Sequence, residues 1–112
     1  MINIYVLNLF LYTGTPLTMR YLNKACKRVT KWHSLGIQLD IPVEQLDSIE
    51  KTYHMQGSDR LKTEMFNKWL KRSPNASWTD LITALRDIDE VTVANDIEQQ
   101  QVLYDDLRIN NS

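Results

Sequence analysis

Apolar residues recur along this chain with a helical spacing. From residue 17 onward they stand three or four positions apart within each segment, and the phase of the pattern changes at short polar breaks. A half-buried strand would instead alternate apolar and polar residues along its length. Pro42, Gly57 and Pro74 mark three of the breaks, where a helix is expected to begin or end. The pattern predicts a series of six short amphipathic helices.

The first three helices are predicted between residues 16 and 53. Pro16 suits a first helical turn, and the apolar face of that helix is expected to comprise Leu17, Tyr21, Ala25 and Val29. The second carries Trp32, Leu35 and Leu39, and its Gly36 suggests that a neighbouring backbone approaches closely there. The third begins at Pro42 and carries Leu46, Ile49 and Tyr53.

Three more helices are predicted after Gly57. In the fourth, Leu61, Met65 and Trp69 repeat every four residues. Ser77 and Asp80 form a short capping box for the fifth. Asp89 is expected to cap the sixth, whose apolar pattern allows it to continue beyond Ile97, although the glutamine run at 99–101 leaves its end undefined. The further apolar positions of these helices are Phe66, Leu70, Trp78, Leu81, Leu85, Ile88, Val93, Ala94, Val102, Leu103 and Leu107.

These helices must bury their apolar faces against one another, because no strand is predicted to cover them. The expected fold is therefore an all-α, antiparallel helical bundle. A chain of 112 residues is enough for one domain. The residues expected in its core are Trp32, Leu35, Leu39, Leu46, Ile49, Trp69, Trp78, Leu81, Leu85 and Ile97.

The first residues are apolar for about a dozen positions, which is short of the roughly 20 that a membrane-spanning helix needs. No Lys or Arg precedes them, which disfavours a signal peptide. Residues 1–15 are therefore expected to be an N-terminal apolar extension of a domain at 16–98, without a membrane span. Residues 99–112 are expected to be a C-terminal helical extension or tail.

Composition narrows the possible functions. The net charge of −1 gives no general attraction to nucleic acid or acidic lipid. Cys26 is the single cysteine and cannot form an internal disulfide, while His33 and His54 do not supply a metal-binding set with it. We expect no cofactor and no metal, and a reducing compartment, the cytoplasm, is favoured.

An ordered set of residues across five predicted helices resembles the death-domain family. Its members here are Trp32, Leu35, Gly36, Leu39, Leu46, Ile49, Trp69, Leu70, Trp78, Leu81, Ala84, Leu85, Val93, Ala94 and Ile97. The resemblance covers roughly residues 16–98. His33 departs from the basic residue that often follows this tryptophan in the family, and residues 1–12 and those after Glu98 have no counterpart in the pattern.

The resemblance implies a six-helix Greek-key bundle that is not an enzyme and takes no small-molecule substrate. Death domains bind other death-fold domains in receptors, adaptors and kinases that assemble signalling or cell-death platforms. One type of contact joins the first and fourth helices of one copy to the second and third helices of the next. The expected function is homotypic assembly of this kind, in an apoptotic or innate-immune-like pathway.

The charges fit such a contact. Arg20, Lys24, Lys27 and Lys31 are spaced to share one face of the predicted first helix, with Arg28 alongside. The fourth helix adds Arg60, Lys62, Lys68, Lys71 and Arg72, of which Lys68 and Arg72 are expected to join the basic patch. The expected acidic patch comprises Asp40, Glu44, Asp47 and Glu50, with Lys51 placed to pair with Asp47. Complementary patches of this kind would join copies head to tail.

Two other classes are less well supported. A helix-turn-helix-like nucleic-acid-binding domain could use the basic stripe, but Glu44, Asp47 and Glu50 on its groove-facing helix would repel phosphates. An enzyme would need a catalytic set or a phosphate-binding loop, and neither is evident in the sequence. Cys26 lies at the edge of an apolar stripe and is expected to be a core residue.

Overall fold

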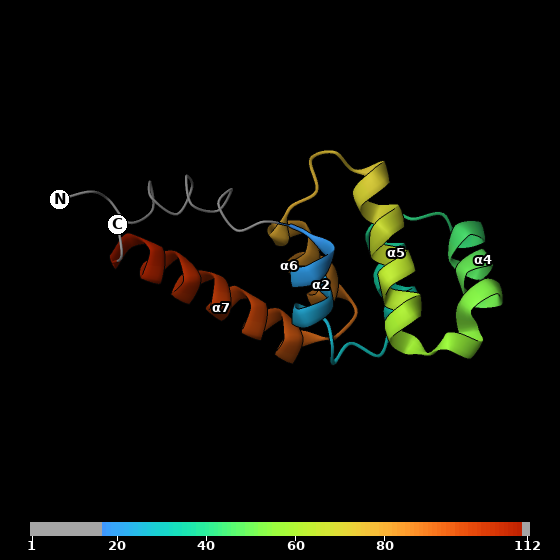
Figure 1. Ribbon diagram of the computed structural model, residues 1–112, viewed down its shortest axis with the longest axis horizontal. Coiled ribbons are helices and arrows are strands. Elements are labelled where there is room, and N and C mark those ends of the chain that lie inside the picture. Colours follow the sequence, from blue (N-terminus) through green and yellow to red (C-terminus); the bar gives the residue numbers. More distant parts are fainter. Residues whose placement is uncertain (1–16, 111–112) are drawn as a thin grey trace.

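The computed structural model describes residues 17–110 and shows an all-α bundle (Figure 1). Within these residues the backbone forms six α-helices and one 3₁₀ turn, without a strand. The helices are α2 (Met19–Ala25), α3 (Trp32–Gln38), α4 (Val43–Tyr53), α5 (Ser58–Arg72), α6 (Trp78–Asp87) and α7 (Val91–Asn110), and the turn η1 (His54–Gln56) joins α4 to α5.

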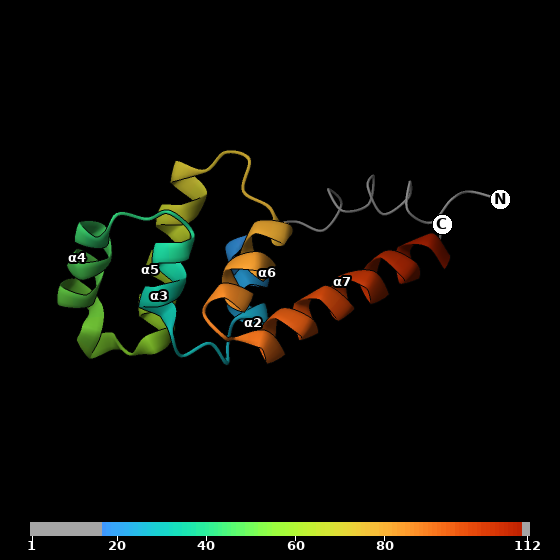
Figure 2. The same cartoon turned by 180° about the vertical axis from the view of Figure 1, so that it is seen from behind.

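Helix α5 is the centre of the bundle. It contacts α2, α3 and α4, and both ribbon views place it between α2 and α4 (Figures 1 and 2). Helix α6 contacts α3 and α7, and α7 also contacts α2, so the last of the described helices packs beside the first of them. This is the predicted six-helix antiparallel Greek-key bundle, and the prediction of the fold is confirmed.

The core runs through all six helices. Every residue that the apolar spacing assigned to it, from Trp32 to Ile97, is buried. Phe66 and Leu22 are fully buried as well, and the Phe66 and Trp69 rings lie 6.3 Å apart, centroid to centroid. Helices of seven residues, such as α2 and α3, are marginal on their own, so this shared core is what keeps them folded.

The predicted apolar face of the first helix was wrong at Tyr21, which is exposed. Val29 is buried as predicted, Leu17 and Ala25 are partly buried against the core, and Leu22 and Cys26 are buried although they were not assigned to this face. The two faces stand one position apart, and a four-residue repeat through Tyr21 and Ala25 competes with another through Leu22 and Cys26. The bundle buries the second set because α2 packs against both α5 and α7.

Gly36 marks a close approach, although by side chains rather than by the backbone that we expected. A β-carbon at this position would lie 2.5 Å from Leu46 Cδ2 and 3.2 Å from Met65 Cγ. The absence of a side chain therefore lets α4 and α5 pack against α3. The Arg60 guanidinium, 4.7 Å from the centre of the Tyr53 ring, adds a second contact between α4 and α5.

The helix ends confirm one predicted cap and correct another. Ser77 and Asp80 form a reciprocal capping box at the start of α6. Asp89 does not cap the next helix: its φ of 62° is left-handed, and it ends α6 by donating its N–H to Arg86 O. Glu90 takes the capping place, since its carbonyl accepts from Ala94 N.

Asp40 ends α3 in the same way. Its φ is 64°, its N–H donates to Ile37 O, and the N–H of Ile41 donates to Gly36 O. Both helices thus close with a Schellman motif in which an aspartate occupies the position that glycine usually takes.

Helix α7 continues to Asn110, and its C-terminal part projects away from the other helices (Figures 1 and 2). The predicted apolar extension at residues 1–15 lies outside the described residues. Among the residues that are described, no helix is both long enough and apolar enough to cross a membrane.

Candidate interaction surfaces

The predicted basic stripe is divided in the structure. Helix α2 ends at Ala25, so it carries Arg20 and Lys24, while Lys27 lies in the following turn and Lys31 at the start of α3. The four cations therefore do not share one helical face, because the chain leaves the helix after its second turn. We call the exposed residues Arg20, Lys24 and Lys27 the α2 basic surface.

Lys31 and its neighbour Arg28 bind groups of their own fold. The Lys31 ammonium donates to Ile88 O at 3.0 Å, and Arg28 forms an ion pair with Asp96 on α7. Between them, Thr30 N donates to the Glu90 carboxylate at 3.2 Å. These contacts hold the connection between α2 and α3 against the α6–α7 corner, so these two cations are less available to a partner than their exposure suggests.

Lys24 and Lys27 border a pocket of about 350 Å³ between α2 and α5. Asn23 and Thr63 meet across it, with 3.2 Å between the Asn23 Oδ1 and Thr63 Oγ1 atoms. Within the described part of the chain, Arg20, Lys24 and Lys27 have no acidic partner. Asp59 lines the same pocket as Lys24 and Lys27, but its nearest described cation is Lys62.

Lys68 and Arg72 are exposed on α5 but belong to a different flank from the α2 basic surface. Thr63 faces the pocket beside α2, and Lys68 lies about 140° round the helix from it at 100° per residue. Arg72 follows Lys68 on the same flank as Glu64, four residues apart in each case. The structure therefore does not join these two residues to the basic residues of α2.

The acidic residues lie mainly on the outermost helix. Glu44, Asp47 and Glu50 are exposed along α4. Asp40 is also exposed and lies before α4, in the left-handed turn that ends α3. Figure 1 shows α5 between α4 and α2, so this acidic surface and the α2 basic surface lie on opposite sides of the bundle. We call Glu44, Asp47 and Glu50 the α4 acidic surface; Asp40 instead lines a pocket with Trp69 of α5 and with Asp80 and Asp87 of α6.

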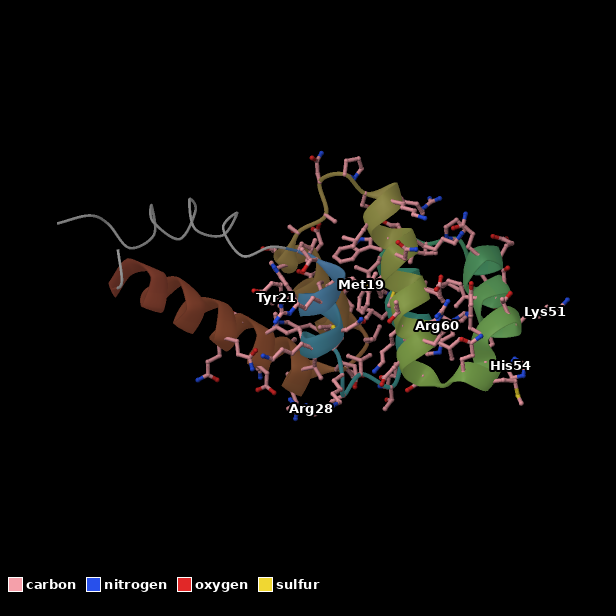
Figure 3. All side chains as sticks on the ribbon, viewed as in Figure 1. Met19, Tyr21, Arg28, Lys51, His54 and Arg60 are labelled. Atoms are coloured by element: carbon pink, nitrogen blue, oxygen red, sulfur yellow. The ribbon has the colours of Figure 1, made fainter. Side chains whose placement is uncertain are left out.

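One predicted pair on α4 does not form. Asp47 lies 3.1 Å from the Nε2 atom of His33 on α3, rather than pairing with Lys51. Figure 3 shows the Lys51 side chain pointing outward from α4. Among the described side chains, Glu44 and Glu50 form no ion pair.

Lys62 was expected among the surface cations of the fourth helix, and this expectation was wrong. Its side chain is buried, with 3% of the residue exposed, and its ammonium donates to the carbonyls of Cys26, Lys27 and Val29. The sequence could not predict this role, because every residue has a backbone carbonyl and the sequence does not show which carbonyls a lysine will meet in the fold.

Cys26 is a core residue, as its place beside the apolar stripe predicted. Burial raises the pKa of its thiol to about 12; the charge of Lys62 opposes this rise and that of Glu90 adds to it. The thiol therefore stays protonated and unreactive at neutral pH. In the described range, no cluster of His, Cys, Asp or Glu could hold a metal ion.

The family model of the death domain matches residues 19–101. The chain belongs to the death-domain family. The match spans all of the helices described above except the projecting end of α7. No curated protein and no solved structure matches the chain significantly.

Membership defines the general function. Death domains are non-enzymatic modules that bind other death-fold domains in signalling, so this death domain is a protein-interaction module in signalling. Its candidate binding surfaces are the α2 basic and α4 acidic surfaces.

Proposed function

We propose that this death domain mediates homotypic assembly by joining the α2 basic surface of one copy to the α4 acidic surface of the next. The observation that carries the proposal is the separation of charge across the bundle. Among the described residues, the α2 basic surface and the carboxylates of Glu44 and Glu50 on α4 form no ion pair, and α5 lies between α2 and α4. The setting that we propose is a cytoplasmic adaptor or receptor tail in an apoptotic or innate-immune-like pathway.

Such a contact is heterologous, because the two surfaces that meet are different. Repeated head to tail, it produces rings or open helical assemblies rather than closed two-fold dimers. Exposed ion pairs contribute only about 0–1 kcal/mol each, so a single contact is weak. Assembly then depends on several copies engaging together, as suits a signalling platform.

The nucleic-acid alternative is not favoured by the charges. Glu44 and Glu50 are exposed on the helix that would enter a groove, where they would face phosphates.

Two variants test the proposal. The basic-reversed variant carries Lys24→Glu and Lys27→Glu, and the acidic-reversed variant carries Glu44→Lys and Glu50→Lys. We expect each to remain folded, with a nearly unchanged melting temperature, and to lose self-association in size-exclusion chromatography with light scattering. Wild-type association should also weaken as the salt concentration is raised, because salt screens exposed charges.

Mixing the two variants is the sharper measurement. Each keeps one original surface, and the two reversed surfaces complement one another, so an equimolar mixture should associate although neither variant does alone. A matched control compares Lys24→Glu with Lys71→Glu, which reverses an exposed cation on the outward face of α5. Association that survives both double reversals would contradict the proposal, as would equal losses from the two single reversals.

A further inference from the structure

The connection between α2 and α3 is held by a buried ammonium. Lys62 on α5 donates to Cys26 O at 3.1 Å, Lys27 O at 2.8 Å and Val29 O at 3.1 Å. The carbonyls just beyond the last turn of α2 thus converge on one side chain, and 3% of Lys62 is exposed.

These contacts satisfy the buried charge without an effective anionic partner. An ammonium has three N–H donors and no acceptor, and here three carbonyls match them. Asp59 Oδ1 lies 3.6 Å away, but the Asp59 side chain is 82% exposed and its attraction is weakened by water. Carbonyls near the end of a helix lack helical partners and carry partial negative charge, so a cation is favoured there.

The opposite side of the same connection is held by α6 and α7. Thr30 N donates to Glu90, and Lys31 donates to Ile88 O. Lys27 lies between the two sets of contacts: its carbonyl accepts the shortest of the Lys62 bonds while its side chain is exposed beside the pocket. These contacts hold the backbone at Lys27, while its ammonium forms no ion pair with any described residue.

We propose that Lys62 is a positioning residue for assembly, which holds the turn so that Lys24 and Lys27 are presented to the α4 acidic surface of another copy. This inference rests on the proposed function. Without the three bonds, the turn would have to be ordered at each binding event, and that entropy loss weakens association.

The test replaces Lys62 by methionine, which keeps an unbranched apolar stem and removes all three donors. Lys68→Met is the matched control, because it removes an exposed ammonium from the same helix. The two charge-reversed variants serve as one-sided probes. The basic-reversed variant offers its acidic surface and so reports on the basic surface of the protein tested, and the acidic-reversed variant reports on the acidic surface.

We expect a one-sided defect. Lys62→Met should bind the basic-reversed probe about ten-fold more weakly than wild type does, while binding the acidic-reversed probe unchanged. Lys68→Met should leave both unchanged. Equal losses for the two probes would indicate general destabilisation and overturn the positioning role, as would unchanged binding to both.

Hydrogen exchange gives an independent readout. The amides of Val29 and Thr30 donate to Cys26 O and to Glu90, and they should exchange faster in Lys62→Met while the amides of α6 do not change. If wild type binds neither probe, the proposed function is wrong, and hydrogen exchange alone tests the role of Lys62. Faster exchange confined to this turn in Lys62→Met would show that Lys62 holds the turn, and unchanged exchange would overturn that role.

Lys62→Arg covers the case in which Lys62→Met does not fold. Its planar fork keeps the charge but cannot direct three donors at converging carbonyls. We expect the same one-sided loss at smaller magnitude, and wild-type binding to both probes would overturn the proposal.

Discussion

The two charged sides of this death domain differ in how much of their charge the fold uses. On the α4 side, Glu44 and Glu50 are exposed and unpaired within the described residues, and Asp47 pairs with His33 alone. Beside the α2 basic surface, three further cations, Arg28, Lys31 and Lys62, all bind groups of the same chain. Charged side chains on an outer helix remain available to a partner, whereas some of those beside a connection between helices are used in hydrogen bonds and ion pairs that hold the connection.

Packing explains the difference. Helix α4 covers one side of α5 and buries Leu46 and Ile49, so its charged positions face water. The connection after α2 lies between α5 and the α6–α7 corner. At the end of such a short helix, backbone carbonyls and N–H groups have no hydrogen-bond partners within the helix. The cations and the carboxylate nearest to them supply the missing hydrogen bonds.

The largest expected effect removes the core that both sides share. Trp32→Ala on α3 and Trp78→Ala on α6 should each lower the free energy of unfolding by about 3–5 kcal/mol, because each deletes a buried ring. Thermal and urea unfolding followed by circular dichroism measures it. His33→Ala, next to Trp32 and partly exposed, is the control and should cost less than about 1 kcal/mol. A loss below 1 kcal/mol for either tryptophan would show that it is not a core residue.

The next effect concerns the α2 side and appears at alkaline pH. The Cys26 thiol has a pKa of about 12 in the fold against an ordinary value of 9.0. The protonated thiol contributes fully to folding stability below pH 9, where it is protonated in both the folded and the unfolded protein. This contribution is lost as the pH rises from 9 towards 12, because the thiol ionises in the unfolded protein first. Stability should fall by about 1.4 kcal/mol for each pH unit in that window.

Cys26→Ala is the control for this effect. Its own stability at pH 7 is lower, but its decline between pH 9 and pH 11 should be shallower than that of wild type, since other groups titrate equally in both proteins. Parallel declines would contradict a protonated buried thiol. Slow alkylation of wild type by iodoacetamide in native buffer, with fast alkylation in urea, is the expected companion result.

The smallest effect compares the two aspartates that end helices in left-handed turns. Asp40→Gly beside α4 and Asp89→Gly beside α7 should each raise the free energy of unfolding by about 0.5–1 kcal/mol, because glycine adopts a positive φ without steric cost. Asp87→Gly, inside the last turn of α6, is the matched control and should destabilise by a similar amount. Urea midpoints give the sign in each case, and a destabilising glycine at 40 or 89 would contradict the proposed strain.

Comparison with the sequence shows which features a pattern can predict. The tryptophans, the capping box of Ser77 and Asp80, and the break at Gly57 were read correctly because each leaves a local signature of spacing or turn chemistry. The fold followed from these signals together with the resemblance.

The errors gather on the α2 side, where local signals compete. The predicted face through Tyr21 and the buried face through Leu22 both repeat every four residues, so spacing did not decide between them. Lys62 was assigned to the surface because lysine is rarely buried unless it is paired. Its partners are main-chain carbonyls some 33 to 36 residues away, which only the folded chain brings together.

Those long separations also set the order in which the domain can be completed during synthesis. Helix α2 is synthesised before the residues that secure its connection to α3. That connection closes on Lys62 and, through Arg28, on Asp96, which lies 68 positions after Arg28. Domains fold largely as units while the chain emerges, and contacts between distant residues must wait for both partners. Helix α2, the first of the described helices, is thus among the last of them to be secured, and the α2 basic surface is completed only after Lys62 and Asp96 have been made.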